Sequence, residues 1–208
     1  MLGRVYLALE LTAIFIGIPL LFVFRILPGY PLVLLMLVAL AACAYLKREE
    51  TFPTGWLLNG EGARRHWRQV ALRSLVLAAA LGALVVVWMP GRLFDCLRQT
   101  PLLWAALMVL YPVLSVYPQE LVYRAFFFHR YEALFAGPRS MMLASATVFA
   151  FAHVVMGNWL SVVLSAAGGL LFAQTYQKSR SLLLTSLEHA LFGNFIFTIG
   201  LGQFFMHR

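Results

Sequence analysis

The chain has 208 residues, of which 62% are hydrophobic and only 12% charged, and its mean hydropathy is +0.83. Soluble domains are about 45–50% apolar and roughly 25% charged, so this composition indicates one transmembrane domain over residues 1–208 and leaves no room for a soluble one. The formal net charge of +8 is explained by basic loops that set topology and attract anionic lipids of the bilayer. No folded basic surface is available for nucleic acid.

Apolar stretches long enough to cross a bilayer as helices recur along the chain. The first begins like a signal peptide, but it contains Glu10 and lacks a cleavage site, so we expect it to be retained. The fourth is long and contains Pro112 and Pro118, which are expected to kink it. The pattern predicts an all-α, polytopic bundle of about seven transmembrane helices, at residues 5–24, 31–46, 70–89, 101–128, 140–157, 160–177 and 181–205.

Arginine and lysine gather in alternate loops, and such residues favour the cytoplasmic side of a membrane. Their distribution predicts an N-in, C-out orientation with an odd number of spans. The long loop at 47–69 carries Trp56, Trp67 and several arginines, which predicts a segment at the cytoplasmic interface. Arginine far outnumbers lysine, as is typical of GC-rich bacterial genomes, so the expected location is the bacterial inner membrane.

Four ionisable side chains lie inside apolar spans: Glu120 and Arg124 one turn apart, His153, and His189. Ionisable groups are costly at membrane depth and there mark functional sites. Depth can be counted at about 1.5 Å per residue from the basic residue at the cytoplasmic end of each span, which is Arg130, Arg139 or Arg180. On this count Glu120 lies roughly 15 Å, His153 roughly 21 Å and His189 roughly 14 Å deep. All three are near the middle of a core of about 30 Å, so we expect them to converge with Arg124 on one cavity.

These residue types suit hydrolysis of an amide. A glutamate and a histidine within hydrogen-bond reach can activate water as a general base, and a second histidine with a nearby amide can donate to a developing oxyanion. The alternative explanations are structural. The Glu120–Arg124 pair could serve only to hold two helices together. A single histidine in a span is more often an interhelical hydrogen-bond donor than a catalyst. Asn158, at a helix end, is expected to be a cap rather than a catalytic residue.

Three short motifs follow one another on separate spans: QELVYR at 119–124, FAFAH at 149–153 and HALFGN at 189–194. In this order they resemble the CPBP family, the CAAX-protease and bacteriocin-processing glutamic intramembrane endopeptidases. The resemblance covers about residues 101–205, and the wording of the first and last motifs is most similar to the myxosortase branch. It implies a protease without a metal or other cofactor, acting near the C-terminus of a membrane-associated or tagged protein or peptide.

The resemblance also implies roles for individual residues. A glutamate and His153 would activate water, Arg124 would orient the glutamate, and His189 with Asn194 would stabilise the oxyanion. In the family the asparagine follows the histidine at four residues. Asn194 follows at five, which turns it away from the histidine's face of the helix.

A second departure concerns the base. The family motif usually has two adjacent glutamates, and Gln119 occupies the place of the first. Glu120 would then have to serve as the base, and Glu188, beside His189, is a spare carboxylate. Gln119 marks either a variant branch or an inactivating change, and the sequence leaves both open.

Three other functions remain as alternatives. A non-catalytic member of the family would act as a membrane binding, immunity or scaffold protein, and Gln119 favours it. A zinc protease could use two histidines and one glutamate as ligands, but the sequence contains no HExxH motif. A transporter with repeated halves has only the spacing H-x-x-x-G-N, shared by His153 and His189, in its favour.

Overall fold

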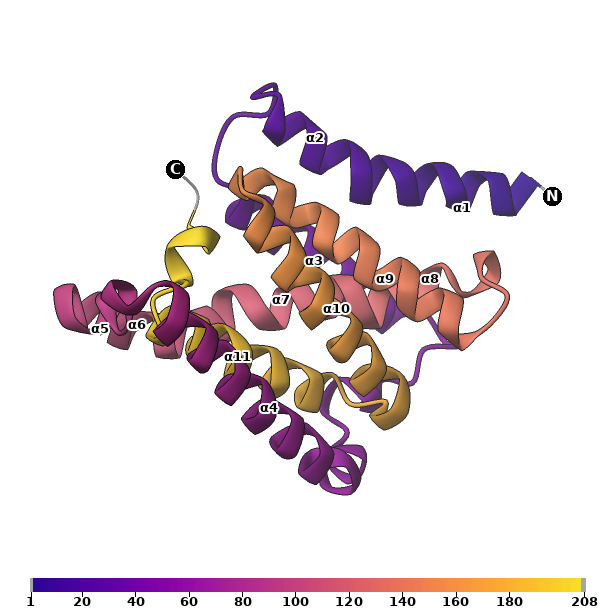
Figure 1. Ribbon diagram of the computed structural model, residues 1–208. Helices are drawn as coiled ribbons and strands as arrows, with labels where there is room; N and C mark the ends of the chain where they lie inside the picture. Colours follow the sequence, from indigo (N-terminus) through magenta and orange to yellow (C-terminus); the bar gives the residue numbers. More distant parts are fainter. Residues whose placement is uncertain (1, 207–208) are drawn as a thin grey trace.

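The computed structural model describes residues 2–206, and within them all regular structure is helical. Figure 1 shows the helices. They are α1 (Leu2–Thr12), α2 (Ile18–Val23), α3 (Pro31–Arg48), α4 (Gly60–Trp88), α5 (Asp95–Gln99), α6 (Pro101–Tyr111), α7 (Tyr117–Glu120), α8 (Phe127–Arg130), α9 (Pro138–Ala152), α10 (Trp159–Ser179) and α11 (Leu182–Thr198). Short 3₁₀ turns lie at Thr54–Leu58, Pro90–Arg92, Glu132–Leu134, His153–Met156 and Gly202–Phe205, and π turns at Ala13–Gly17, Pro112–Val116 and Leu121–Phe126.

The predicted membrane bundle is confirmed. Six helical segments among the described residues are long and apolar enough to cross a bilayer, and α11, with 17 residues, is a shorter seventh. The third span starts earlier than predicted, because Asn59 caps α4 by accepting a hydrogen bond from the Gly62 N–H at 3.0 Å. The second half of the predicted interfacial loop therefore forms the first turns of α4. The N-in orientation remains a prediction.

The two prolines of the fourth span change its winding. A proline lacks an N–H and crowds the preceding turn, and here a π turn begins at Pro112 itself. A second π turn, Leu121–Phe126, comes directly after α7. Wider turns of this kind rotate the side chains of the next turn and are frequent at functional sites. They enclose α7, the short helix that carries Glu120.

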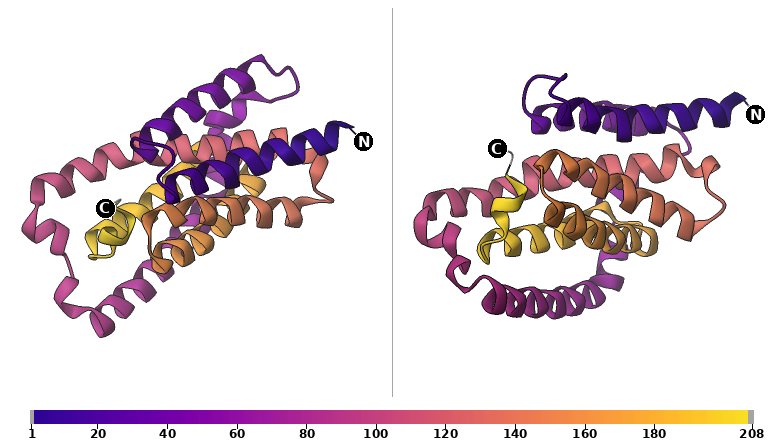
Figure 2. Two further views of the ribbon diagram at one scale, coloured as in Figure 1. Left: turned by 90° about the horizontal axis from the view of Figure 1, so that it is seen from above. Right: turned by 45° about the horizontal axis from the view of Figure 1, so that its top comes forward.

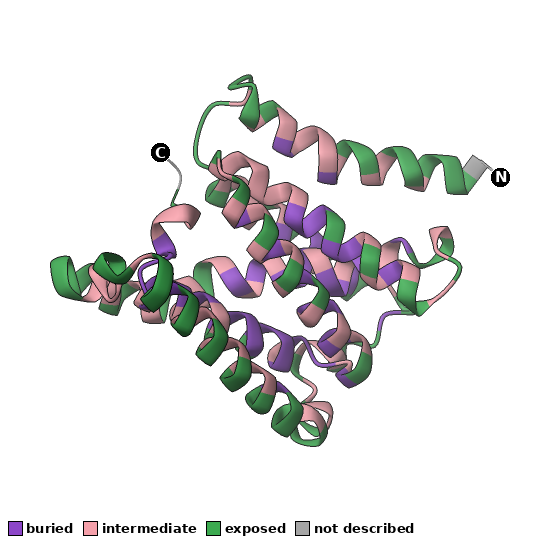
Figure 3. Cartoon of the chain, in the orientation of Figure 1, coloured by how far each residue is buried: buried purple, intermediate pink, exposed green. Residues whose placement is uncertain are grey.

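Buried residues gather in the second half of the chain. Only 11% of the most apolar window of the fourth span is buried, against 33% in Pro138–Met156 and 44% in Trp159–Ser179. The first span runs along the outside of the bundle (Figure 2). In Figure 3 the surfaces of α1, α4 and α6 are largely exposed, whereas buried residues concentrate in α7 to α11. A lone chain with apolar exposed helices presents them to lipid, and the buried polar side chains lie mainly in the segment from α7 to α11.

Small buried residues on α10, among them Ser165, Gly169 and Ala173, allow close packing against α9. A Cβ on Gly169 would lie 3.1 Å from the Phe149 ring and 3.3 Å from the backbone of Ala146. A larger residue in place of Gly169 would push the two helices apart. This agrees with the preference for small residues at helix interfaces in membranes.

A polar contact ties the first span to the bundle. Arg130, at the end of α8, holds Glu10 of α1 with two hydrogen bonds of 2.9 and 2.7 Å. The hydroxyl of Tyr131 donates to the same carboxylate at 3.0 Å. Beyond this ion pair, α2 contacts the 3₁₀ turn that begins at His153, so the first span covers the side of the bundle on which His153 lies.

Candidate active site

Glu120 is a fully buried carboxylate with both oxygens engaged. Its exposure is 0%, and it lies at the end of α7, between the two π turns. Oε1 accepts a hydrogen bond from Nδ1 of His189 at 2.8 Å, and Oε2 lies 3.2 Å from Nε of Arg124. A carboxylate this deep in an apolar bundle must be compensated by charge or hydrogen bonds, and these two side chains provide both.

Arg124 is equally buried, at 0% exposure, and holds three helices together. Nη1 donates to Oγ of Ser145 on α9 at 2.7 Å. Nη2 donates to the carbonyl of Gly169 on α10 at 3.3 Å, and the guanidinium carbon lies 5.0 Å from the centre of the Phe149 ring. The predicted pairing with Glu120 is therefore one part of a wider set of contacts that fixes α9 and α10 against α7.

His189 has a partner on each ring nitrogen. Nδ1 meets Glu120, and Nε2 lies 3.1 Å from the hydroxyl oxygen of Tyr111. Because a carboxylate only accepts hydrogen bonds, Nδ1 carries a proton. The ring stacks on Phe172, with centroids 4.5 Å apart and an interplanar angle of 16°. His189 is thus fixed in position and in tautomer.

His153 has a different environment. It ends α9, and its Nδ1 donates to the carbonyl of Phe149 at 2.8 Å. In the neutral ring Nε2 is then the unprotonated nitrogen and can accept a proton. The ring of Phe149 lies 4.9 Å from the His153 centroid and 5.5 Å from the His189 centroid, so one phenylalanine separates the two histidines.

Two cavities meet at His153. The first, of about 330 Å³, lies beneath α2 and is here called the α2 cavity. The second, of about 220 Å³, reaches His189 and Tyr111 and is here called the His189 cavity. Residues that line both are Ser115, Gln119, His153, Met156 and Phe205.

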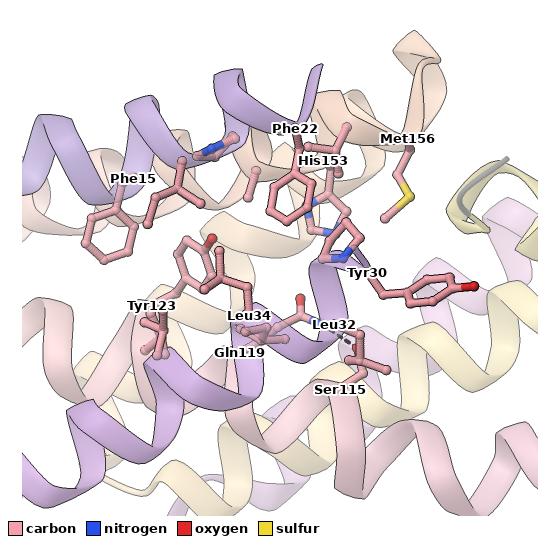
Figure 4. A pocket seen from close by; sticks show the side chains of 18 of the residues that line it. Phe15, Phe22, Tyr30, Leu32, Leu34, Ser115, Gln119, Tyr123, His153 and Met156 are labelled. Carbon is pink, nitrogen blue, oxygen red and sulfur yellow. Dashed lines mark hydrogen bonds between the residues drawn. The ribbon is translucent and has the colours of Figure 1, made fainter. Parts of the chain in front are cut away.

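Gln119 faces His153 across this junction. Figure 4 shows Gln119 and Ser115 on one side of the α2 cavity, with His153 and Phe22 on the other. The side-chain amide of Gln119 donates to Oγ of Ser115 at 2.7 Å, which leaves its carbonyl oxygen as an acceptor. Position 119, which in the family motif would hold the first glutamate, therefore faces the cavity.

The structure brings Glu120, Arg124 and His189 into direct contact, and it places His153 across Phe149 from them. It does not bring Glu120 to His153: Glu120 lines neither cavity, because both of its oxygens face the protein interior. The cavity-facing pair is instead Gln119 and His153. Adjacent residues on a helix point about 100° apart, which separates Gln119 from Glu120.

Asn194 also lies away from both cavities. Its amide donates to the carbonyl of Met108 on α6 at 3.2 Å. In an α-helix that carbonyl would accept from the N–H of residue 112, and Pro112 has none. Asn194 therefore supplies a donor that the proline removed, and it joins α11 to α6 next to Tyr111. The predicted cap at Asn158 is confirmed, since its side chain accepts from the N–H of Ser161 at 2.9 Å.

Glu188 belongs to a second buried ion pair. Its exposure is 0%, and it accepts hydrogen bonds from Arg73 of α4 and, at 2.7 Å, from the hydroxyl of Thr175. Arg73 also donates to Gln174 and to the carbonyl of Leu171. This cluster fastens α4 to α10 and α11, so Glu188 is engaged in helix packing.

Sequence reasoning missed Tyr111, Ser145 and Arg73. A signal existed for the first: Tyr111, Ser115 and Gln119 recur at four-residue spacing in the fourth span, and all three line the His189 cavity. Ser145 and Arg73 carry no local signal, because their partners lie on other helices. Among residues 2–206, no three His, Cys, Asp or Glu side chains gather closely enough to hold a metal ion.

Comparison with known families agrees with the motifs. Residues 98–195 match the family described as "Rce1-like: Type II CAAX prenyl endopeptidase Rce1-like". The match covers just under half of the chain and includes every residue predicted to be catalytic, from Glu120 to Asn194. Residues 98–195 therefore match a model of the predicted CPBP family, which is a family of proteases, and the myxosortase branch stays a prediction. No curated protein and no solved structure matches the chain.

The contacts of Arg124 predict that Arg124→Ala destabilises the whole bundle. It strands the Glu120 carboxylate in an apolar interior, and removing one partner of a buried ion pair costs about 3–5 kcal/mol. Thermal unfolding in detergent measures the effect. Arg139→Ala, which removes an exposed arginine at the start of α9, is the matched control and should leave the melting temperature unchanged. Equal melting temperatures for both variants would contradict a buried, mutually dependent pair.

The position of Asn194 predicts a dependence on Pro112. Asn194→Ala should lower the free energy of unfolding by about 0.6–1.7 kcal/mol, the range for interhelical hydrogen bonds in membranes. In a Pro112→Ala background the loss should be smaller, because alanine restores an N–H that reaches the Met108 carbonyl. Unfolding of the four chains in mixed detergent micelles measures the coupling. The same loss in both backgrounds would show that Asn194 does not replace the missing donor.

Proposed function

We propose that this CPBP-family protein is an active intramembrane endopeptidase that hydrolyses a peptide bond directly with water. The observation that supports the proposal most strongly is the junction of the two cavities, where Gln119 and His153 face each other beside the fixed Glu120–His189 pair. The protease class comes from the family of residues 98–195. The catalytic roles of individual residues are inferred from their contacts.

His153 is the proposed general base. Its Nδ1 proton is committed to the Phe149 carbonyl, so Nε2 is the nitrogen that can take a proton from water. The carbonyl oxygen of Gln119 would accept the second hydrogen of that water and aim its oxygen into the cavity. An amide cannot take the proton itself, so activation rests on the histidine, in contrast to the expected pairing of His153 with Glu120.

Glu120 then acts through His189. Its carboxylate holds the Nδ1 proton of the ring and compensates a second proton on Nε2 when one is present. Arg124 keeps the carboxylate in place through its contacts with α9 and α10. When it carries both protons, this fixed ring would present a positive charge beside the carbonyl that is attacked, which would stabilise a developing oxyanion.

The steps balance without a covalent intermediate. Water gives one proton to Nε2 of His153 while its oxygen attacks the carbonyl carbon of the substrate. The carbonyl oxygen becomes an oxyanion on the side of His189. When the intermediate collapses, the C–N bond breaks and His153 returns the proton to the leaving nitrogen, which leaves a carboxyl group and an amine.

The α2 cavity indicates the kind of substrate. Its walls are mostly apolar side chains from α3 and from the first span, of which α2 is part, and Gln119 and Ser115 lie opposite His153 (Figure 4). An extended, apolar segment of a membrane-anchored peptide would fit there with its scissile bond at Gln119. We place the cleavage near the substrate's C-terminus, and the protein N-in, C-out in a bacterial inner membrane.

A catalytically inactive binding or scaffold protein is the second candidate. Gln119 favours it, because an amide replaces the glutamate that the family motif usually has at this cavity-facing position. Such a protein would bind the same membrane-anchored segment in the α2 cavity without cleaving it.

A cleavage assay in liposomes tests the hydrolytic function. Wild-type chain with membrane-anchored test peptides should give new N-termini detectable by mass spectrometry. His153→Ala should reduce kcat by about 10²- to 10⁴-fold, the usual contribution of general-base catalysis. His129→Ala, which removes a histidine that packs on Phe52, is the control and should cleave normally. Activity removed by a chelator and restored by zinc would overturn the assignment in favour of a metal site.

Gln119→Glu separates the possible bases. A carboxylate at the cavity junction should strengthen proton removal by His153, so kcat should rise by about tenfold or more. Glu120→Gln, which changes the buried neighbour instead, should lower kcat with little change in KM. An unchanged rate in Gln119→Glu would contradict a base at the junction. Cleavage by Gln119→Glu alone, with an inert wild type, would support the inactive binding protein.

A further inference from the structure

We propose that the hydroxyl of Tyr111 is a catalytic group that donates a hydrogen bond to the oxyanion, the role expected of Asn194. This inference rests on the proposed peptide hydrolysis and adds a residue to it. It is carried by three features: where the hydroxyl lies, what holds it, and how the chain accommodates the ring.

Tyr111 borders the cavity in which the reaction is proposed to occur. Tyr111 ends α6 and lines the His189 cavity together with Gln119 and His153. The proposed base and this phenol therefore border one space, in which a peptide carbonyl would be flanked by both. Asn194 borders neither cavity, and its side-chain amide donates to the carbonyl of Met108.

The hydroxyl of Tyr111 also connects His189 to that cavity. Both nitrogens of His189 are engaged, Nδ1 by Glu120 and Nε2 by Tyr111 at 3.1 Å. When the ring carries two protons, Nε2 donates to the phenol oxygen, and the phenol proton is then free to point at the substrate. Hydrogen bonds in such a chain polarise one another, so a second proton on His189 would act on the oxyanion through Tyr111.

The surroundings form a seat for the ring of Tyr111. Gly193 lies directly beneath it, and any Cβ at that position would overlap the Tyr111 ring. Phe197 packs edge-on against the other side, with centroids 5.2 Å apart and an angle of 74°. The Asn194–Met108 hydrogen bond fixes α6 against α11 one turn away. Consecutive residues of the last motif therefore share one task, which is to hold Tyr111 against His189.

The added step changes no proton count. Tyr111 keeps its proton throughout and donates only a hydrogen bond, which strengthens as negative charge develops on the carbonyl oxygen. The proton taken by His153 from water still goes to the leaving nitrogen. A group that interacts more strongly with the transition state than with the bound substrate raises kcat and leaves KM nearly unchanged.

Tyr111→Phe is the primary test. It keeps the ring in the seat at Gly193 and removes only the hydroxyl. We expect kcat to fall by about 10²- to 10³-fold, as when one oxyanion donor is lost, with KM within about twofold. Tyr117→Phe, a tyrosine on α7 that packs against the apolar core, is the control and should keep the wild-type kcat. The melting temperature of each variant shows whether the fold is intact.

A second variant separates donation from support. Incorporation of 3,5-difluorotyrosine at position 111 retains the ring and hydroxyl but makes the phenol a stronger donor and acid. A donor role predicts a changed kcat and a pH–rate profile whose alkaline limb begins at lower pH. A packing role predicts the kcat and pH–rate profile of the wild type. If the wild type cleaves and Tyr111→Phe has the same kcat as the wild type, this inference is overturned and the hydrolytic function is not. Absence of cleavage by the wild type overturns the hydrolytic function, and this inference with it.

Discussion

The placement of a carboxylate and a guanidinium at zero exposure inside apolar helices governs the rest of this structure. Each charge costs several kcal/mol to remove from water even after relaxation, and lipid offers no compensating groups. Glu120 and Arg124 meet that cost together with His189, Ser145 and a backbone carbonyl. Because these partners come from α9, α10 and α11, satisfying one ion pair fixes the relative positions of four helices. The proposed catalytic site is thereby also a polar anchor of the bundle.

The winding of the fourth span decides which residues face the cavities. Pro112 interrupts the α-helical hydrogen bonds, and the π turns on both sides of α7 rotate the adjoining side chains about the helix axis. As a result Gln119 faces His153 while Glu120 turns inward to His189. The proline also frees the Met108 carbonyl that Asn194 binds. A local departure from regular helix thus has consequences on α11, far away in the sequence.

Hydropathy and helical spacing predicted much of this arrangement. Span number, helix positions and the Glu120–Arg124 pair follow from composition and from the i, i+4 relation. Matching depths predicted that Glu120, His153 and His189 would converge with Arg124 on one cavity; His189 contacts Glu120, whereas Glu120 lines neither cavity. The five-residue spacing predicted that Asn194 turns away from His189, but not its partner, a carbonyl 86 positions away. The inward facing of Glu120 could not be predicted, because it depends on the π turns beside α7. The pairing of Arg73 with Glu188 was hidden for a similar reason: its members lie 115 positions apart.

The central claim is that Glu120 serves catalysis through His189 and not as the base beside His153. Double-mutant cycles on kcat/KM in liposomes test it directly. One cycle combines Glu120→Gln with His189→Gln, and the other combines Glu120→Gln with His153→Gln. The account predicts that the first double variant is no slower than His189→Gln alone, while in the second the two losses multiply. Multiplying losses in the first cycle, with no further loss in the second, would place Glu120 with His153 and contradict the account.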